Sequence, residues 1–222
     1  ERIRRHAAAA GIRMHGTVLD AGCQTGRLLI PLAKDGFQAT GIDTSGFALR
    51  RARKHASAAG VRVSLVSGDL ARVLEAHPDR QYDIVLCAEV LYLSQDYRRM
   101  LGLLAGAVKP GGLLCISHRS RFYYLLDALR RRDAAALQLI LTASDGCVEG
   151  PKRGFYNWQT EKELRALYNR LGLEWIAMYP IDQFAWLSGI APSRLTDEQR
   201  DLLLRMELET AGEPGTCGRY LF

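Results

Sequence analysis

The sequence predicts an α/β fold organised around a doubly wound, mostly parallel sheet. Between residues 17 and 118, short apolar segments alternate with amphipathic ones, and glycines or prolines separate them. This alternation is typical of parallel strands joined by helices. Polar residues follow several of the apolar segments. Because ligands bind outside the carboxyl ends of such strands, these polar residues predict a binding site.

The first strand and helix flank the turn around which the chain is organised. Residues 1–11 predict a short basic helix, and residues 18–21 predict a buried strand. A turn with Gly22 and Gly26 follows, and then a helix with an apolar face that ends at Gly36. Glycines let backbone N–H groups approach a ligand, and a helix N-terminus is partially positive. We therefore expect a cofactor-binding turn.

The later units repeat this pattern. Strands are expected over residues 37–42, 61–66, 81–87 and 113–117, and helices over residues 45–59 and 96–108. The run Lys109-Pro110-Gly111-Gly112 predicts the turn before the fifth strand. The candidate ligand groups stand at or just past predicted strand ends: Asp20, Gly22, Asp43, Asp69, Glu89 and His118.

The pattern changes after residue 120. Residues 122–143 predict one long helical stretch, and residues 144–154 predict a loop. Most of the aromatic residues lie in this second half, which is typical of a second core or of a cap over a flat acceptor. Thr160 and Thr196 predict N-caps of helices that reach Leu171 and about Ala211. Strands are expected over residues 173–181 and 217–222.

Composition narrows the class of protein. No apolar run reaches the roughly 18 residues that span a bilayer, and no charged leader precedes an apolar core, so a soluble, cytoplasmic protein is expected. Five cysteines without a Cys-x-x-Cys pair predict neither a zinc site nor a disulfide framework. The net charge of +6 permits nucleic acid or an acidic partner, but its arginine clusters also fit solvated helix faces.

The glycine turn favours S-adenosylmethionine over a dinucleotide. A nicotinamide site has G-x-G-x-x-G after an apolar strand end, whereas here Asp20 precedes Gly22 and Gly26. S-adenosylmethionine carries a positive amino group and a sulfonium, which a nearby carboxylate stabilises. Asp43 follows the turn by about 20 residues, the distance at which an acid meets ribose hydroxyls. Asp69, after the third strand, is expected to accept from the adenine amino group.

These motifs resemble those of the class I, Rossmann-like S-adenosylmethionine-dependent methyltransferases of small-molecule type. Five ordered segments carry the resemblance: residues 20–26, 41–43, 68–70, 82–93 and 109–112. It implies seven strands, the last antiparallel, with a helical insertion after strand five. The chain is then one domain with an N-terminal helix, a cofactor-binding half, an insertion that caps the acceptor, and the rest of the sheet, at residues 1–16, 17–118, 119–158 and 159–222.

The resemblance also implies the cofactor residues. The glycine turn would hold the methionine part, Asp43 the ribose, and the segment after strand four the wall beside the methyl group. The set is Asp20, Ala21, Gly22, Cys23, Gln24, Gly26, Asp43, Thr44, Asp69, Leu70, Ala88 and Glu89. Gln24 replaces a glycine usual in the family. A positive φ there would cost about 1 kcal/mol, whereas an allowed conformation would let Gln24 reach the ligand's carboxylate.

Methyl transfer is an in-line displacement that needs few obligatory catalytic residues. His118 is the candidate general base for an oxygen acceptor, unless it only bonds backbone at a strand end. Glu89 is the second candidate, facing the acceptor or the cofactor, or capping the next helix. The expected acceptor-binding residues follow strands four and five or end the insertion: Tyr92, Arg119, Phe122, Tyr124, Tyr156 and Trp158. Arg119 and Arg121, if turned inward, favour a carboxylate or phosphate on the acceptor.

The expected function is methyl transfer from S-adenosylmethionine to oxygen or nitrogen of a small biosynthetic acceptor. No metal is expected, because Tyr92 stands where related quinone enzymes have a histidine. An RNA or protein methyltransferase is the first alternative, and it requires the arginine clusters to form one basic face around the cofactor mouth. A non-catalytic binding module is the second. Neither a membrane nor a nucleic-acid partner is expected, and the sequence leaves the oligomeric state open.

Overall fold

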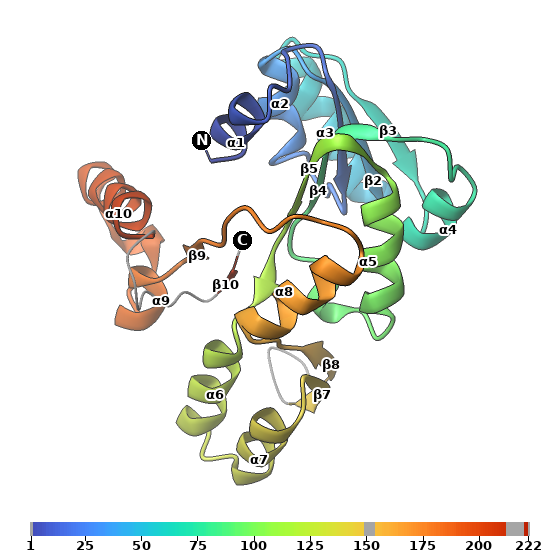
Figure 1. Cartoon of the computed structure of the whole chain (residues 1–222). Helices are drawn as coiled ribbons and strands as arrows, with labels where there is room; N and C mark the ends of the chain where they lie inside the picture. The colour runs from blue at the N-terminus through green and yellow to red at the C-terminus, as the bar shows by residue number, and fades with distance from the viewer. Residues whose placement is uncertain (1, 149–153, 212–219, 222) are drawn as a thin grey trace. The chain divides into compact units, whose positions relative to one another are not determined.

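The computed structural model describes residues 2–148, 154–211, 220 and 221 (Figure 1). They form two compact units. The first unit comprises Glu1–Leu91 and Asp96–Ile116, and the second comprises Tyr92–Gln95 and Ser117–Phe222. Each unit is described by itself below.

The first unit is built on a five-stranded sheet in which every neighbouring pair is parallel. Its strands are β1 (Thr17–Ala21), β2 (Gln38–Asp43), β3 (Ser64–Ser67), β4 (Tyr82–Cys87) and β5 (Val108–Ile116). The order is β3-β2-β1-β4-β5, so the winding reverses between β1 and β4. The predicted parallel α/β sheet is confirmed, and the reversal places the carboxyl end of β1 where ligands bind in such folds.

Helices cover the sheet of the first unit. They are α1 (Arg2–Ala9), α2 (Leu29–Lys34), α3 (Gly46–Ala58), α4 (Leu70–Glu75) and α5 (Tyr97–Gly106). A short 3-10 helix, Leu91–Leu93, starts at the last residue of the first segment of this unit. Strands β1 and β4 are buried along almost their whole length, as expected for a sheet covered on both faces. One apolar cluster joins Ala7 of α1 to Val18, Leu32 and Ile84. The core therefore lies between the sheet and its helices.

An acid holds the amino ends of the central strands together. Asp83 Oδ2 accepts hydrogen bonds from the Thr17 backbone N–H and hydroxyl, both at 2.7 Å, and from Lys109 Nζ at 2.8 Å. Burial alone would raise the pKa of Asp83, but these partners lower it to about 2. The predicted turn at residues 109–112 is a bulge inside β5, because Tyr82 pairs with Val108 and Ile84 with Leu113. The fifth strand therefore starts earlier than predicted.

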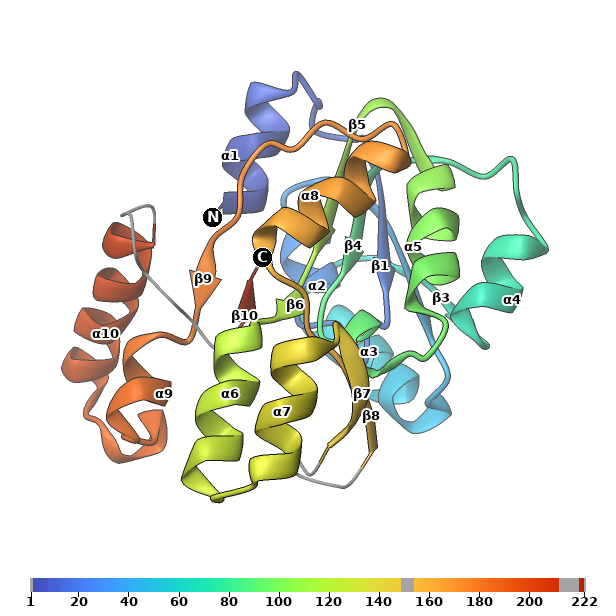
Figure 2. The same ribbon diagram turned by 60° about the horizontal axis from the view of Figure 1, so that its bottom comes forward.

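The second unit contains helices and short antiparallel strands. Strands β6 (His118–Arg119), β10 (Tyr220–Leu221) and β9 (Pro180–Ile181) form one small sheet in that order, and β7 (Asp145–Val148) pairs with β8 (Gly154–Asn157). The helices are α6 (Arg121–Arg130), α7 (Ala134–Thr142), α8 (Glu161–Arg170), α9 (Phe184–Ser188) and α10 (Asp197–Thr210), with a 3-10 helix at Pro192–Arg194. Helices α6 and α7 lie side by side in Figures 1 and 2.

The long helix predicted over residues 122–143 is wrong, because two helices replace it. Arg132 adopts a φ of +59°, which stops α6. Asp133 then caps α7 by accepting a hydrogen bond from the Ala136 N–H at 2.9 Å. The predicted loop after it is also wrong in part, since Asp145–Val148 is a strand. By contrast, the N-caps predicted at Thr160 and Thr196 are confirmed, and both residues form capping boxes.

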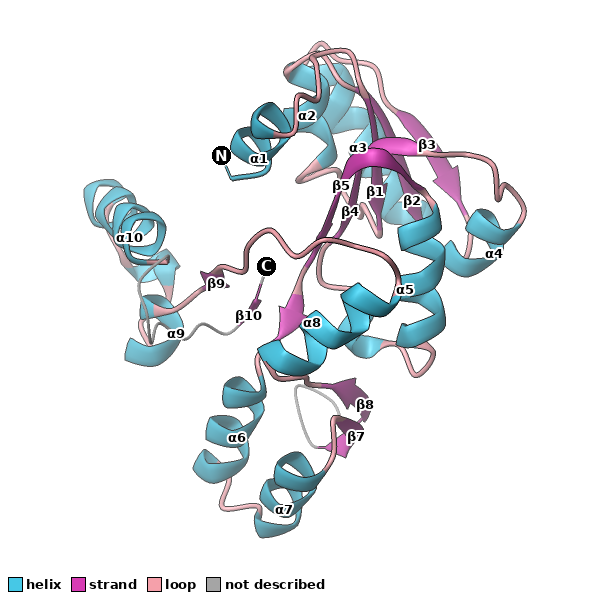
Figure 3. Cartoon of the chain, in the orientation of Figure 1, coloured by secondary structure: helices cyan, strands magenta, loops and turns pink. Residues whose placement is uncertain are grey.

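The strand predicted over residues 173–181 is present only at Pro180–Ile181 (Figure 3). Trp175, in the middle of the expected strand, packs instead beside helix α8. Its ring lies 5.7 Å from that of Tyr168 and 4.6 Å from the Arg165 guanidinium. The apolar alternation of this segment thus reflects packing on a helix rather than pairing in a sheet. Of the last predicted strand, Tyr220–Leu221 is confirmed and residues 217–219 and 222 lie outside the described residues.

Candidate active site

The glycine turn after β1 is held by backbone hydrogen bonds. Gly22 and Gly26 both have φ of +85°, a conformation that glycine adopts without strain. The N–H groups of Gly22 and Cys23 donate to the Ile42 carbonyl at 2.8 and 3.0 Å. The Gly26 N–H donates to the Cys23 carbonyl at 2.8 Å. The turn is therefore fixed against the end of β2, next to Asp43.

Gln24 takes up the positive φ that the family's glycine would allow. Its φ is +46°, which strains a residue with a side chain by about 1 kcal/mol. In this conformation the Gln24 N–H donates to Asp43 Oδ2 at 2.8 Å, and the Ser45 N–H donates to Asp43 Oδ1 at 2.8 Å. The sequence left open whether Gln24 has a positive φ or an unstrained conformation, and the structure has the positive φ. The carboxylate of Asp43 is thereby oriented by backbone groups on both sides, with Thr44 exposed beside it.

Asp20 lies beneath the turn, with only 3% of its surface exposed. Burial raises the pKa of Asp20 to about 7, although the Leu29 N–H and the Arg27 charge oppose that rise. Leu29 is the first residue of α2, so Asp20 joins the end of β1 to the start of that helix. Ala21 and Cys23 are buried too, and burial raises the pKa of the Cys23 thiol to about 12. These residues support the turn from below.

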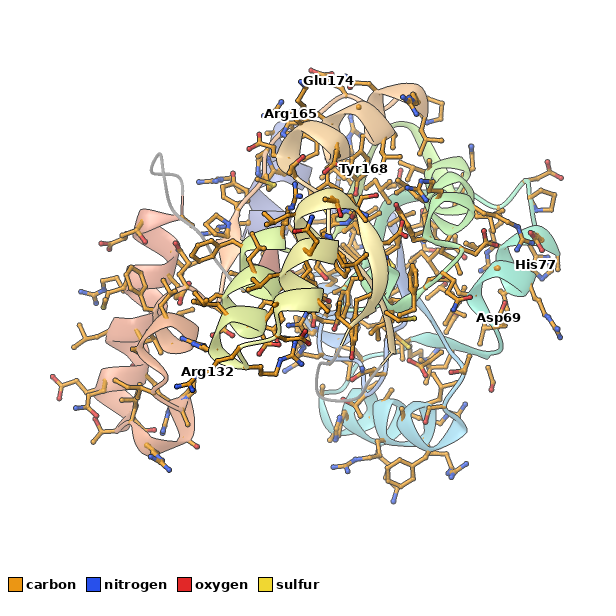
Figure 4. The ribbon with its side chains drawn as sticks, turned by 90° about the horizontal axis from the view of Figure 1, so that it is seen from below. Asp69, His77, Arg132, Arg165, Tyr168 and Glu174 are labelled. Atoms are coloured by element: carbon orange, nitrogen blue, oxygen red, sulfur yellow. The ribbon has the colours of Figure 1, made fainter. Side chains whose placement is uncertain are left out.

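Asp69 follows strand β3 and is the N-cap residue of helix α4. Its Oδ1 accepts from the Arg72 N–H at 3.1 Å, and Leu70 beside it is buried. Figure 4 shows Asp69 at the start of α4, with His77 beyond the other end. The Asp69 side chain is exposed to solvent. Asp20 and Asp43 thus lie within the last two residues of β1 and β2, and Asp69 follows the neighbouring strand β3.

The segment after β4 contacts the glycine turn through a residue that sequence reasoning missed. Ala88, Glu89 and Val90 are half-buried, and Glu89 has a φ of +63°. A Cβ atom on Gly22 would lie 2.3 Å from Val90 Cγ2. Val90 lies inside the motif of residues 82–93, but only the folded chain brings it onto Gly22. Val90 therefore brings the segment that carries Ala88 and Glu89 against the glycine turn.

His118, the candidate base, is buried in the second unit. Its Nε2 lies 2.7 Å from the Tyr168 hydroxyl, and the two rings meet edge to face. In the described part of the chain no hydrogen-bond partner contacts its Nδ1. Burial lowers the pKa of His118 to about 4, so the imidazole is neutral at pH 7. A neutral imidazole retains a lone pair that can accept a proton.

Most of the predicted acceptor residues belong to one aromatic cluster in the second unit. Tyr92, Tyr124, Tyr156 and Trp158 pack together there, and Trp158 donates its indole N–H to the Ala143 carbonyl at 2.8 Å. The Arg119 guanidinium lies 4.8 Å from the centre of the Tyr92 ring, a cation–π contact. This cluster is the core of the unit.

Two residues predicted to bind the acceptor, Phe122 and Arg121, are not part of this cluster. Phe122 is 43% exposed. Arg121 does not turn inward, since its Nε donates to the Ile140 carbonyl at 2.9 Å. Among the described residues, no group of His, Cys, Asp and Glu is arranged to hold a metal ion, and no helix has the length and apolarity needed to span a membrane.

Known proteins resemble the first half of the chain. Residues 18–112 match the family described as "Methyltransferase domain". The ubiquinone biosynthesis O-methyltransferase of Serratia proteamaculans is 38% identical over 105 residues, which cover 47% of this chain and 43% of that protein. The chain thus spans less than half the length of this relative. The family match covers the residues that carry the sequence motifs.

Solved structures show the same fold at lower sequence identity. Magnesium protoporphyrin IX methyltransferase from Synechocystis PCC 6803, with bound SAH, has a TM-score of 0.60 at 21% identity, covering 80% of this chain and 73% of that one. A methyltransferase from Thiobacillus denitrificans, in complex with S-adenosyl-L-homocysteine, has a TM-score of 0.58 at 23% identity, covering 97% and 77%. Residues 18–112 therefore match the methyltransferase-domain family, and the chain has the fold of S-adenosylmethionine-dependent methyltransferases.

Proposed function

We propose that this protein transfers a methyl group from S-adenosylmethionine to oxygen or nitrogen of a small biosynthetic acceptor. The observation that carries the proposal is the orientation of Asp43 by the N–H groups of Gln24 and Ser45, beside a turn with two glycines at φ of +85°. A carboxylate fixed in this way is suited to accept hydrogen bonds from ribose hydroxyls. Relatives that match about half of the chain are named ubiquinone biosynthesis O-methyltransferases, which supports a small biosynthetic acceptor.

Different residues of the first unit bind different parts of the cofactor in this proposal. Gly22 and Gly26 give the methionine part close access to backbone N–H groups, Asp43 binds the ribose, and the exposed carboxylate of Asp69 accepts from the adenine amino group. Asp20 supplies negative charge below the sulfonium. Ala88 and Glu89 form the wall beside the methyl group. S-adenosylmethionine supplies the methyl carbon and its sulfonium leaving group, and the protein aligns the acceptor with that bond.

The acceptor residues of the proposal are those of the aromatic cluster with Arg119 and Phe122. Flat side chains and one buried cation suit an aromatic acceptor that carries a negative group. His118 is proposed as the base that receives the proton of an oxygen acceptor. Its burial leaves the imidazole neutral and therefore free of a proton at pH 7, but the same lowered pKa makes it a weak base.

The arrangement of the arginine clusters favours a small acceptor over RNA or a protein. In the first unit the clusters lie on three separate helices, α1, α3 and α5, rather than on one. Arg4 pairs with Asp35, and Arg99 pairs with Asp96 and Glu75. Arg131, in the second unit, pairs with Asp127. Cations neutralised by acids contribute little to docking a polyanion.

We also propose that the chain forms one methyltransferase domain with a seven-stranded sheet. A single residue, Ser117, separates the end of β5 from the start of β6, and β10 runs antiparallel to β6. This connection supports an antiparallel last strand beside strand five. The insertion at residues 119–158 and the C-terminal part at 159–222 then complete the domain.

The test is isothermal calorimetry with S-adenosylhomocysteine, followed by a screen of small acceptors for methyl transfer from S-adenosylmethionine, read by mass spectrometry. Binding in the micromolar range and a methylated product are expected. Absence of S-adenosylhomocysteine binding would favour the non-catalytic module. Methylation of RNA or protein, with no small product, would favour the other alternative.

A further inference from the structure

Val90 joins the two segments that flank the proposed methionine site. Gly22 has no side chain, and the space where its Cβ would project is taken by Val90 Cγ2, at 2.3 Å from that position. A contact this short cannot exist with a real Cβ. Gly22 is therefore required for two reasons: its φ of +85°, and the presence of Val90.

The other side of the turn is packed in the same way. A Cβ on Gly41 of β2 would lie 2.6 Å from Cys23 Sγ and 2.9 Å from Leu29 Cδ2. Two hydrogen bonds to the Ile42 carbonyl hold the turn on that side. Val90 supplies the matching contact on the side of β4. The turn is thus packed between the end of β2 and the segment that follows β4.

The segment that Val90 anchors has an unusual backbone. Glu89, directly before it, has a φ of +63°, a region that costs a residue with a side chain about 1 kcal/mol or more. The 3-10 helix at Leu91–Leu93 begins directly after Val90. A strained residue persists only where its neighbours hold it in place. Val90, wedged on Gly22, is such a neighbour.

We propose that Val90 is a positioning residue of the cofactor site. Its branched side chain, seated on Gly22, sets the separation between the glycine turn and the segment that carries Ala88 and Glu89. This inference rests on the proposed function, because it assigns Val90 a role only if the cofactor binds between these two segments.

Two substitutions at Val90 test the proposal. Val90→Ala removes the methyl groups that contact Gly22 and should weaken binding of S-adenosylhomocysteine about tenfold, since small displacements at a binding site have large effects. Val90→Thr keeps the branched shape and should bind within about twofold of the unmodified protein. Val61→Ala, at another half-buried valine of the first unit, is the matched control and should leave affinity unchanged. Calorimetry gives the affinities, and thermal unfolding reports whether each variant folds.

A double-mutant cycle with Gly22 isolates the contact. Gly22→Ala alone should abolish measurable binding, because it adds a Cβ against Val90 and strains the backbone. In the Val90→Ala background the same change should cost only about tenfold, the effect of the positive φ alone. Equal losses in both backgrounds, or a Val90→Ala variant that binds like the unmodified protein, would overturn the assignment of Val90. If the unmodified protein itself does not bind, the proposed function fails, and the inference fails with it.

Discussion

The two units carry their polar groups in different surroundings. In the first unit, backbone N–H groups orient the carboxylates of Asp43 and Asp69 at strand ends. Asp43 is half-buried and Asp69 is exposed to solvent. In the second unit, His118, Arg119 and Tyr124 lie inside an aromatic core, each less than 8% exposed. Backbone geometry therefore builds the proposed cofactor site, whereas side-chain packing builds the proposed acceptor site. We expect changes in the first to affect mainly binding, and changes in the second to affect mainly stability.

The largest effect is expected from Trp158→Ala in the second unit. Trp158 is completely buried, and its removal leaves a cavity and an unpaired Ala143 carbonyl. Large-to-small changes of this kind cost about 3 to 5 kcal/mol. Denaturant unfolding followed by circular dichroism should show that loss, while Leu129→Ala, at a 60% exposed position, should change stability by less than about 0.5 kcal/mol. A similar small change for both variants would contradict the core role of Trp158.

Asp43→Ala should separate binding from stability in the first unit. It removes a carboxylate that would accept from both ribose hydroxyls, so affinity for S-adenosylhomocysteine should fall about 100-fold, or roughly 3 kcal/mol. The melting temperature should fall by only a few degrees, because the lost contacts to Gln24 and Ser45 are local. Asp79→Ala is the control, at an exposed acid of the same unit. Unchanged affinity in Asp43→Ala would refute the ribose assignment.

The buried carboxyl of Asp20 predicts a pH dependence of binding. Its pKa in the folded protein is about 7, above the value of 3.8 for an exposed aspartate. Folding therefore favours the protonated form, and stability decreases as the pH rises from about 4 to 7. The sulfonium of S-adenosylmethionine favours the ionised form of Asp20, so affinity for S-adenosylmethionine should rise about tenfold between pH 6 and pH 8. Calorimetry at several pH values should show this slope, and Asp20→Asn should flatten it. A pH-independent affinity in the unmodified protein would rule out the link.

The same difference between the units explains what the sequence could predict. Strand ends in a parallel sheet follow directly from apolar runs and glycines, so the positions of Asp20, Asp43 and Asp69 at or near strand ends could be predicted. Their roles in binding stay predictions. Packing partners distant in sequence could not be read in this way. The contact of Val90 with Gly22 and the bonds of Asp83 to Thr17 and Lys109 depend on the register of β1, β4 and β5. The break at Arg132 comes from its positive φ and from the Asp133 cap that follows, which helical periodicity does not reveal. The loop around Trp175 depends on contacts with α8 that outweigh local periodicity.

The smallest effect is expected from Tyr124→Phe, which tests how the second unit tolerates buried polar groups. In the described part of the chain the Tyr124 hydroxyl has no hydrogen-bond partner, and burial raises the pKa of Tyr124 above its ordinary value. Removing an unsatisfied hydroxyl should leave stability unchanged or raise it by up to about 1 kcal/mol. Tyr168→Phe is the matched control on α8 (Figure 4), because its hydroxyl is bonded to His118 and its loss should cost about 1 kcal/mol. If Tyr124→Phe keeps stability but lowers methyl transfer, the Tyr124 hydroxyl contacts the acceptor. If it destabilises the protein as much as Tyr168→Phe does, the hydroxyl has a structural partner instead.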